Sequence, residues 1–437
     1  GEAIAHVLGF TNIDDRGQEG LELAFENTLR GKPGMKRVIR DRRGRIVEEV
    51  DLVRPAEPGR NITLTIDRRI QFLAYRELKR AMLDTGATSG SAVVLDVASG
   101  EVLAMANLPS FNPNAVGLGN RDAHRNRAVT DVIEPGSTMK PLTVAAALEA
   151  GKITPNTSFN TNPGWMPNGK FRTTDTHNYG VLDTTGVIRK SSNVGAAKIV
   201  HMLPSRDFHE FLVRLGYGRS TGSGFPGESP GSLPKPERWS GTTKQTLSYG
   251  YGLSATPLQI AHTYATLGNR GRAIVPTFIK GNTGEATQVL DERVADEVLR
   301  MMQTVTEPGG TATQAAILGY HVAGKTGTAR ILINGVYSRR YNAFFAGLVP
   351  VDNPRFAMAV VLKDPDPSTG YTGGLVSAPV FKNVMEGALR LMDVPPDDIE
   401  TWLAAQAAAD AKRMRQAGVA PAAPTASQTH EPASAGL

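Results

Sequence analysis

A serine and a lysine three residues apart give the first chemically informative spacing in this sequence. Residues 134–142 read EPGSTMKPL, and Ser137 and Lys140 open a stretch that predicts a helix ending before Gly151. Positions i and i+3 share a helix face with Cβ atoms about 5–6 Å apart, so Lys140 can reach the Ser137 hydroxyl. A serine becomes a nucleophile when a neighbour takes its proton, and a desolvated lysine can be that base. The spacing therefore suggests acyl transfer, although most chance matches to it are surface pairs.

Two further polar motifs follow in the chain. Residues 190–200, KSSNVGAAKIV, contain Ser191 and Asn193 where a loop is predicted to enter a helix, and taken alone they are typical of a helix cap. Residues 325–328, Lys-Thr-Gly-Thr, lie on a predicted strand. A nucleophile at a helix start, a polar pair on a loop and a lysine on a strand form one ordered set. This conjunction favours an acyl-transfer site.

The lysine motif has a second interpretation, because residues 319–326 also match the phosphate-binding pattern G-x-x-x-x-G-K-[ST]. That pattern requires a helix that starts at its Gly-Lys-Thr and binds phosphate with its first N–H groups. The residues that follow, TGTARILINGVYSRRYNAFF, place β-branched runs on both sides of Asn334-Gly335 and predict a hairpin. We therefore disfavour an NTPase.

Strands at both ends of the chain and helices between them must position these motifs. Residues 91–107 predict an antiparallel hairpin that turns at Ser99-Gly100, and strands return from residue 317 onward. Residues 121–220 are predicted to be mainly helical, and NITLTI at 61–66 alternates as a strand does. Because tight turns join the strand pairs, the predicted fold class is α+β: an antiparallel sheet flanked by helices, with an all-helical subdomain.

Capping residues mark several predicted helices. Asp67 can cap a helix that runs to about Asp84, and Thr256 can open one that Gly268 closes. A further helix is predicted at about 375–392.

Composition and charge are those of an ordinary globular protein. The chain has 437 residues, 40% of them apolar, and a net charge of +6, and it is too long for one comfortable core. Positive charge concentrates in KRVIRDRRGR at residues 36–45. Apolar residues alternate on both sides of Arg43-Gly44 and no aromatic residue is interleaved, so we predict a β-hairpin tip and no nucleic-acid surface.

Cysteine does not occur in the sequence, which excludes disulfides, thiolate nucleophiles and zinc–thiolate sites. The sequence has no H-E-x-x-H or comparable ligand cluster, so we expect neither a metal nor a cofactor. No apolar run reaches the roughly 18–20 residues of a membrane span. The chain starts at Gly1 in mid-pattern, and we expect a membrane anchor to precede it in the native protein.

The three motifs in this order resemble those of the class B penicillin-binding proteins, most closely the FtsI-type division transpeptidases (penicillin-binding protein 3) of Gram-negative bacteria. SYGYGLSATPLQIAHTYATLGNRG and GYTGGLVSAPVFKNVMEGALRLM also resemble that family's transpeptidase domain, and GQEGLELAFENTLRGKPG resembles the end of its N-terminal pedestal. The resemblance implies a β-lactamase-like transpeptidase fold in three regions. These are a pedestal remnant at 1–60, the transpeptidase domain at 61–395, and a helical, then Ala/Pro-rich and disordered tail at 396–437.

The resemblance also implies a role for each catalytic residue. Ser137 would attack the penultimate D-Ala of a D-Ala-D-Ala stem peptide, and Lys140 would take the serine proton. Ser191 would relay a proton to the leaving amine, and Asn193 would hold the substrate amide. The backbone N–H groups of Ser137 and Thr328 would form the oxyanion hole.

Substrate binding is implied for the strand motif and for one aromatic residue. Lys325, with Thr326 and Thr328, would bind the terminal carboxylate, which the carboxylate of a β-lactam mimics. Gly327 would let the substrate backbone lie against the strand edge. Tyr371, in GYTGG, is either an aromatic wall of the pocket or a turn residue between glycines.

The implied function is septal peptidoglycan cross-linking at the periplasmic face of the inner membrane, inhibited covalently by β-lactams. The implied partners are stem peptides, a glycosyltransferase and other divisome proteins, with no nucleic acid. Two alternatives share the motifs: a serine β-lactamase and a β-lactam sensor. A class A β-lactamase needs a glutamate that aims water at the acyl-enzyme, and no convincing Glu-x-x-x-Asn segment follows Ser191.

Overall fold

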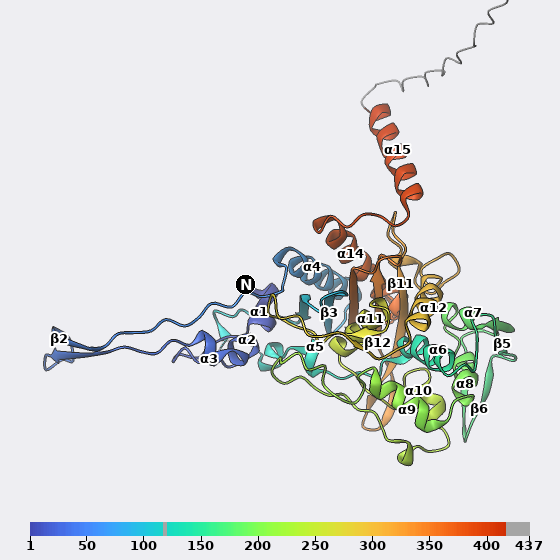
Figure 1. Ribbon diagram of the computed structural model, residues 1–437, viewed down its shortest axis with the longest axis horizontal. Coiled ribbons are helices and arrows are strands. Elements are labelled where there is room, and N and C mark those ends of the chain that lie inside the picture. Colours follow the sequence, from blue (N-terminus) through green and yellow to red (C-terminus); the bar gives the residue numbers. More distant parts are fainter. Residues whose placement is uncertain (117–119, 417–437) are drawn as a thin grey trace, which may run out of the picture.

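A five-stranded antiparallel sheet forms the centre of the protein (Figure 1). The computed structural model describes residues 1–116 and 120–416. The strand order is β11-β12-β13-β3-β4, so the three C-terminal strands extend the early hairpin. β3 and β4 are buried along their whole length, and the predicted antiparallel sheet flanked by helices is confirmed. The strands are β3 (Ser89–Asp96), β4 (Val102–Leu108), β11 (Ala323–Ile333), β12 (Val336–Val349) and β13 (Phe356–Lys363).

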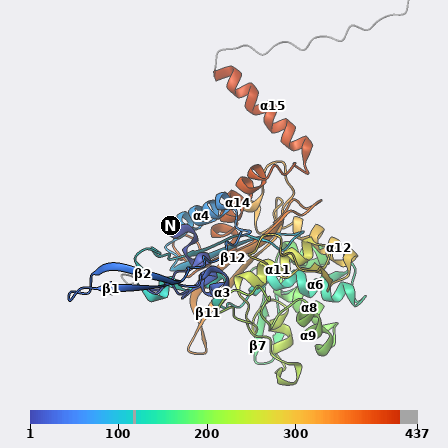
Figure 2. The ribbon, with the colours of Figure 1, turned by 60° about the vertical axis from the view of Figure 1, so that its left-hand side comes forward.

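Helices cover both faces of this sheet (Figure 2). α4 (Arg68–Thr85) and α14 (Ala378–Leu391) pack on one face, and α11 (Pro257–Gly268) packs on the other. The predicted caps are present, because Asp67 accepts two backbone N–H groups of the first turn of α4 and Thr256 forms a reciprocal capping box at the start of α11. The predicted helix near 375–392 is α14, preceded by the short α13 (Gly373–Val376).

Helices make up most of the regular structure in residues 121–220, but two small hairpins interrupt them, so the subdomain is not all-helical, contrary to the prediction. β5 pairs with β8, and β6 pairs with β7. Each of these strands has only three or four residues, too few for an alternating pattern to show in the sequence, and the prediction missed them. This region and the segment after it contain α5 (Arg127–Thr130), α6 (Lys140–Glu149), α7 (Thr184–Arg189), α8 (Asn193–His201), α9 (Ser205–Arg214), α10 (Thr243–Leu247), α12 (Glu292–Gln303), β5 (Ser158–Asn160), β6 (Trp165–Asn168), β7 (Phe171–Thr174) and β8 (Val181–Asp183).

The N-terminal segment consists of short helices and a long hairpin that projects from the remaining elements (Figure 1). β1 and β2 form the predicted hairpin and are exposed along nearly their whole length. The NITLTI segment at 61–66, in contrast, is not a strand: it makes one isolated bridge, from Leu64 to Ile279. The side-chain hydroxyl of Thr65, in this segment, donates to the backbone carbonyl of Val102. The elements are α1 (Ala5–Leu8), α2 (Gly20–Ala24), α3 (Glu26–Leu29), β1 (Met35–Arg40) and β2 (Ile46–Arg54).

A last helix, α15 (Ile399–Gln416), lies in the part of the chain for which a helical tail is expected. The Ala/Pro-rich part, residues 417–437, lies outside the described residues. The two remaining strands, β9 (Arg272–Ala273) and β10 (Thr287–Gln288), form a small pair of their own. Among the helices that the structure describes, none combines the length and the apolar character needed to cross a membrane.

Candidate active site

Ser137 lies in a 3₁₀ turn (Gly136–Met139) that continues directly into α6. The predicted α-helix therefore begins one turn later than expected, because the chain at Ser137 is wound more tightly and residues three apart eclipse each other. Lys140, the first residue of α6, places its Nζ 2.9 Å from the Ser137 Oγ. The φ of Gly136 is +51°, and an added Cβ there would contact the ring of Phe344, so a glycine allows the turn to lie against the sheet.

Ser191 brings the three motifs together. It lies between α7 and α8 with a φ of +58°, a left-handed conformation that is uncommon for serine. Its hydroxyl oxygen is 3.0 Å from Lys140 Nζ and 2.9 Å from Lys325 Nζ. Lys140 also donates to the Ser191 backbone carbonyl at 2.5 Å. The three motifs thus meet in one hydrogen-bonded group, the lysine cluster, which consists of Ser137, Lys140, Ser191 and Lys325.

Burial sets the protonation of the two lysines, since neither side chain has measurable exposure. Burial lowers the pKa of Lys140 to about 7, although the nearby charge of Asp175 raises it. Burial, and then the charge of Lys140, lower the pKa of Lys325 well below its ordinary value. Protonating both buried amines at once costs free energy, because they lie on the same hydroxyl and their positive charges repel each other. Lys140 can therefore accept a proton at neutral pH.

Asp175 holds the loop that carries Ser191 in place, although no motif in the sequence points to this residue. Its carboxylate accepts the hydroxyl of Ser192 at 2.6 Å and the backbone N–H groups of Asn193 at 2.5 Å and Val194 at 3.1 Å. These are the free N–H groups at the start of α8, where a negative charge is stabilised. Because Asp175 is 17 residues before Ser192 in the chain, no local spacing marks it.

Asn193 begins α8 next to this carboxylate. Its Nδ2 donates to the backbone carbonyl of Thr174 at 2.7 Å. Within the described residues its side chain makes no hydrogen bond to Ser137, Lys140 or Ser191. The structure thus brings Asn193 to the same loop as Ser191 without joining it to the lysine cluster.

The Lys-Thr-Gly-Thr motif lies on β11, which forms one edge of the sheet. The strand continues to Ile333 where a phosphate-binding loop would enter a helix, so the strand interpretation is confirmed. Gly327 faces the ring of Phe344 so closely that an added Cβ would lie 1.8 Å from it. Only glycine fits at this position of the edge strand.

Two threonines of the motif are tied to neighbouring segments. The Oγ1 atoms of Thr326 and Thr311 lie 3.0 Å apart. The Oγ1 of Thr328 accepts the backbone N–H of Gly373 at 3.2 Å, which leaves the Thr328 hydroxyl free to donate. The first contact joins β11 to the segment after α12, and the second joins it to the start of α13.

A family model described as "Penicillin binding protein transpeptidase domain" matches residues 90–386. The chain belongs to this family. A second model, described as "Penicillin-binding Protein dimerisation domain", matches residues 3–64. The family model agrees with the geometry, because the serine, the lysines and the strand motif of this transpeptidase all lie within the matched range.

Curated relatives place this transpeptidase among the class B, penicillin-binding protein 3 type. It is 44% identical over 405 residues to the peptidoglycan D,D-transpeptidase FtsI of Escherichia coli, covering 92% of this chain and 68% of that protein. It is 43% identical over 400 residues to the probable peptidoglycan D,D-transpeptidase PenA of Neisseria meningitidis, covering 91% and 68%. The transpeptidase domain of Burkholderia pseudomallei penicillin-binding protein 3 superposes with a TM-score of 0.71 at 38% identity, covering 78% of this chain and 99% of that one. None of these supports a β-lactamase or a sensor.

Tyr371 stacks on Tyr341, with ring centroids 4.4 Å apart and an interplanar angle of 27°. Tyr341 lies on β12 opposite Arg330, which is two residues beyond Thr328 along β11. Tyr371 has no recorded contact with the lysine cluster in the described part of the chain. Its role as a wall of the transpeptidase pocket stays a prediction.

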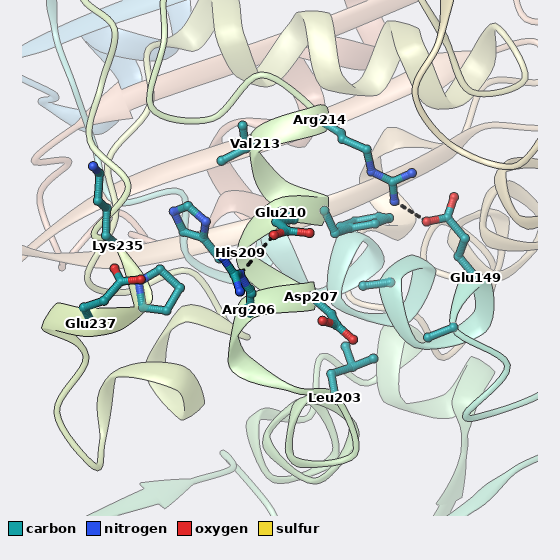
Figure 3. A pocket seen from close by; sticks show the side chains of 14 residues that line it. Glu149, Leu203, Arg206, Asp207, His209, Glu210, Val213, Arg214, Lys235 and Glu237 are labelled. Atoms are coloured by element: carbon teal, nitrogen blue, oxygen red, sulfur yellow. Dashed lines mark hydrogen bonds and ion pairs between the residues drawn. The ribbon is translucent and has the colours of Figure 1, made fainter.

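The pocket shown in Figure 3, of about 790 Å³, does not contain the transpeptidase site. It lies between the end of α6, α9 and residues 235–237, and none of the predicted site residues lines it. Arg214 pairs with Glu149 across it, and Arg206 pairs with Glu210 along α9 (Figure 3). Four of the seven Asp, Glu, Arg and Lys side chains that line it are therefore paired with one another.

One group of possible metal ligands, His321, Asp352 and Asp397, occurs within residues 1–116 and 120–416. The Asp397 carboxylate already accepts the backbone N–H groups of His321 at 2.7 Å and Val351 at 3.1 Å. It therefore joins the segment before α15 to the start of β11 and the end of β12. None of these residues contacts the lysine cluster.

Proposed function

We propose that this transpeptidase cross-links peptidoglycan stem peptides during septal cell-wall synthesis, through an acyl-enzyme on Ser137. The observation that carries the proposal is the position of Lys140 Nζ, which lies within hydrogen-bond distance of the hydroxyls of both Ser137 and Ser191. Its lowered pKa makes it able to take the serine proton at neutral pH. The names of the relatives from Escherichia coli and Neisseria support the same reaction.

In acylation, the Ser137 Oγ attacks the carbonyl carbon of the penultimate D-Ala while its proton passes to Lys140 Nζ. The oxyanion of the tetrahedral intermediate accepts the backbone N–H groups of Ser137 and Thr328. Collapse breaks the peptide bond, and the proton moves from Lys140 through the Ser191 hydroxyl to the departing amine. D-Ala leaves, and the stem peptide stays bound as an ester.

In transfer, the amine of a neighbouring stem peptide attacks the ester carbonyl. The amine loses a proton to Lys140, and the Ser137 oxygen departs and regains a proton from the same lysine. A new peptide bond replaces the ester, and the enzyme returns to its starting state.

The strand motif binds the donor in this proposal. The bound terminal carboxylate favours protonation of Lys325, and Lys325 and the hydroxyls of Thr326 and Thr328 then donate to it; the carboxylate of a β-lactam would occupy the same place. Because Lys325 Nζ is turned to Ser191, the same lysine also orients the proton relay. Asn193 holds the substrate amide, and Tyr371 forms an aromatic wall farther along β11.

We also assign a cellular setting on the strength of this chemistry. The substrate exists outside the inner membrane, so the domain works at its periplasmic face, held there by a membrane anchor. A glycosyltransferase that makes the glycan strands, and other divisome proteins, are the partners that such a reaction requires.

Intact-mass spectrometry after addition of penicillin tests the proposal. The wild type should gain the mass of one penicillin and keep it for a long period, and Ser137→Ala should gain none. Ser240→Ala, which removes an exposed serine hydroxyl, is the control and should label as the wild type does. Labelling of Ser137→Ala would refute the nucleophile, and rapid loss of the wild-type adduct would indicate a β-lactamase. A wild type that labels but never processes a stem-peptide donor would indicate a sensor.

A further inference from the structure

A second pocket, of about 560 Å³, is lined in part by residues 130–134, which directly precede the turn that carries the nucleophile. It forms where the ends of β11 and β13, the start of β3 and the middle of β12 meet residues 130–134 and 252–254. The hairpin that joins β11 to β12 extends beyond the sheet (Figure 2). The volume of the pocket is within the range of small-ligand sites.

This pocket begins close to Ser137. An added Cβ on Gly136, the residue before the nucleophile, would lie 3.6 Å from the side chain of Ala329. Ala329 pairs directly with Asn342, and neighbouring strands are about 4.8 Å apart. Asn342 lines the pocket, and so does Glu134, three residues before Ser137. About one strand spacing therefore separates the pocket from the nucleophile's turn.

The polar groups of the pocket are incompletely paired. Three buried side-chain atoms, Arg127 Nη1, Glu134 Oε2 and Asn342 Oδ1, have no hydrogen-bond partner in the described part of the chain. Arg127 is 4% exposed and Asn342 is 7% exposed. Arg330 and Lys363 also line the pocket, and neither forms an ion pair with any described residue. Buried polar groups are nearly always hydrogen-bonded, so this pairing is completed by something other than these residues.

The unpaired groups specify their partner. Arg330 and Lys363 carry positive charge with no carboxylate partner among the described residues. Arg127, whose Nη2 pairs with Asp122, keeps its Nη1 free to donate to an anionic acceptor. The Glu134 and Asn342 oxygens require N–H or O–H donors. A peptide that ends in a carboxylate offers both kinds of group, whereas an inorganic anion offers only acceptors.

We propose that this pocket binds the carboxylate-bearing part of the acceptor stem peptide, the one whose amine attacks the Ser137 ester. The assignment rests on the proposed function. The donor's carboxylate is already assigned to residues 325–328, so a second carboxylate site serves the second substrate. A side-chain amine several bonds away from the carboxylate can span one strand spacing and reach the ester.

A matched pair of acceptors tests the proposal. Each is a short peptide with the same side-chain amine, one with a free C-terminal carboxylate and the other with a C-terminal amide. With a thioester donor, we measure transfer relative to hydrolysis of the same acyl-enzyme. The wild type should transfer at least about tenfold better to the carboxylate peptide, as expected for one charge-assisted hydrogen bond.

Substitutions in the pocket should remove this preference. Lys363→Met and Arg330→Met should each bring the two acceptors closer to equal transfer, and the double variant should make them equal. Arg339→Met is the matched control: it removes an exposed cation from the same hairpin that does not line the pocket, and it should keep the preference. Equal transfer by the wild type, or a preference that survives in the double variant, would overturn the proposal.

Calorimetry on penicillin-acylated protein supplies a readout that does not depend on turnover. The carboxylate peptide should bind, its amide should bind at least about tenfold more weakly, Lys363→Met should reduce this difference, and the double variant should abolish it. Competition by inorganic phosphate at the concentration of the peptide would mean an anion site only and would also overturn the proposal. If acylation and donor hydrolysis proceed but acceptors are not distinguished, only this inference fails. If Ser137 is not acylated at all, the proposed function fails.

Discussion

Lys140 Nζ lies 2.9 Å from Ser137 Oγ, and the lysine side chain is completely buried. Burial lowers its pKa to about 7. Roughly half of the molecules then carry a neutral amine at pH 7, against about one in 3,000 for a lysine at its ordinary pKa. Lys140 can therefore act as the base for Ser137, because it is close to the hydroxyl and often neutral. A surface lysine at the same spacing would be almost always protonated.

The rate of acylation should follow the deprotonation of Lys140. The neutral fraction of a group with a pKa of about 7 rises about tenfold between pH 6 and pH 8, so the acylation rate constant should rise by the same factor. Stopped-flow measurements with a fluorescent penicillin give this profile. Lys140→Met should be slower by roughly 10²–10⁴-fold and should lose the dependence on pH. A flat wild-type profile over this range would exclude Lys140 as the base.

The same lysine should make the folded protein less stable as pH falls. In the unfolded chain its pKa returns to 10.5, so between about pH 7 and 10.5 the unfolded state binds more protons and stability rises with pH. Below about pH 7 Lys140 is protonated in both states, and the cost of burying the charged amine lowers the free energy of unfolding by up to roughly 5 kcal/mol. Lys140→Met should therefore be more stable than the wild type at pH 6, and the difference should shrink towards pH 10. Urea unfolding of both proteins at several pH values measures this, and a constant difference would contradict it.

The sequence predicted those features that depend on local residue patterns. The caps at Asp67 and Thr256 and the hairpin around Arg43-Gly44 formed as expected, because each is determined by neighbours in the chain. NITLTI at 61–66 failed as a strand, since alternation does not provide a partner strand. The tight turn at Ser137 depends on contact with Phe344, which is distant in the sequence.

The same distinction, between local sequence patterns and contacts of residues distant in the chain, applies to the candidate site. The order of the motifs led to the cluster of Ser137, Lys140, Ser191 and Lys325, since each motif had a family resemblance to support it. Asp175 was missed, because its importance comes from the fold: three donors at the start of α8 converge on it. The burial that lowers the pKa of both lysines also becomes visible only when the chain is folded.

Asp175 should act as a positioning residue with an electrostatic effect. Its charge raises the pKa of Lys140, against the effect of burial. Asp175→Asn should therefore shift the pH midpoint of acylation below that of the wild type, while loss of the carboxylate at the start of α8 slows acylation at every pH. A purely structural role would lower the rate without moving the midpoint. Asp183→Asn removes the capping carboxylate of α7 and is the control, for which we expect an unshifted midpoint.

Gly327→Ala should impair the site through packing alone. The new Cβ would lie 1.8 Å from the Phe344 ring, and the same ring lies 3.3 Å from the Cβ position of Gly136, beside the nucleophile. Either β11 or Phe344 must move, so overpacking should cost about 1–3 kcal/mol of unfolding free energy, and acylation by penicillin should fall with it. Gly241→Ala, where an added Cβ meets nothing within 4 Å, is the control.

A second substitution separates packing from loss of a backbone contact. If the clash with the ring is the cause, Phe344→Leu combined with Gly327→Ala should acylate faster than Gly327→Ala alone, because the smaller side chain leaves room for the methyl group. Chemical unfolding and acylation rates of the three variants decide this. An unimpaired Gly327→Ala enzyme would mean that β11 can move away from Phe344 without disturbing the distance between Lys325 and Ser191.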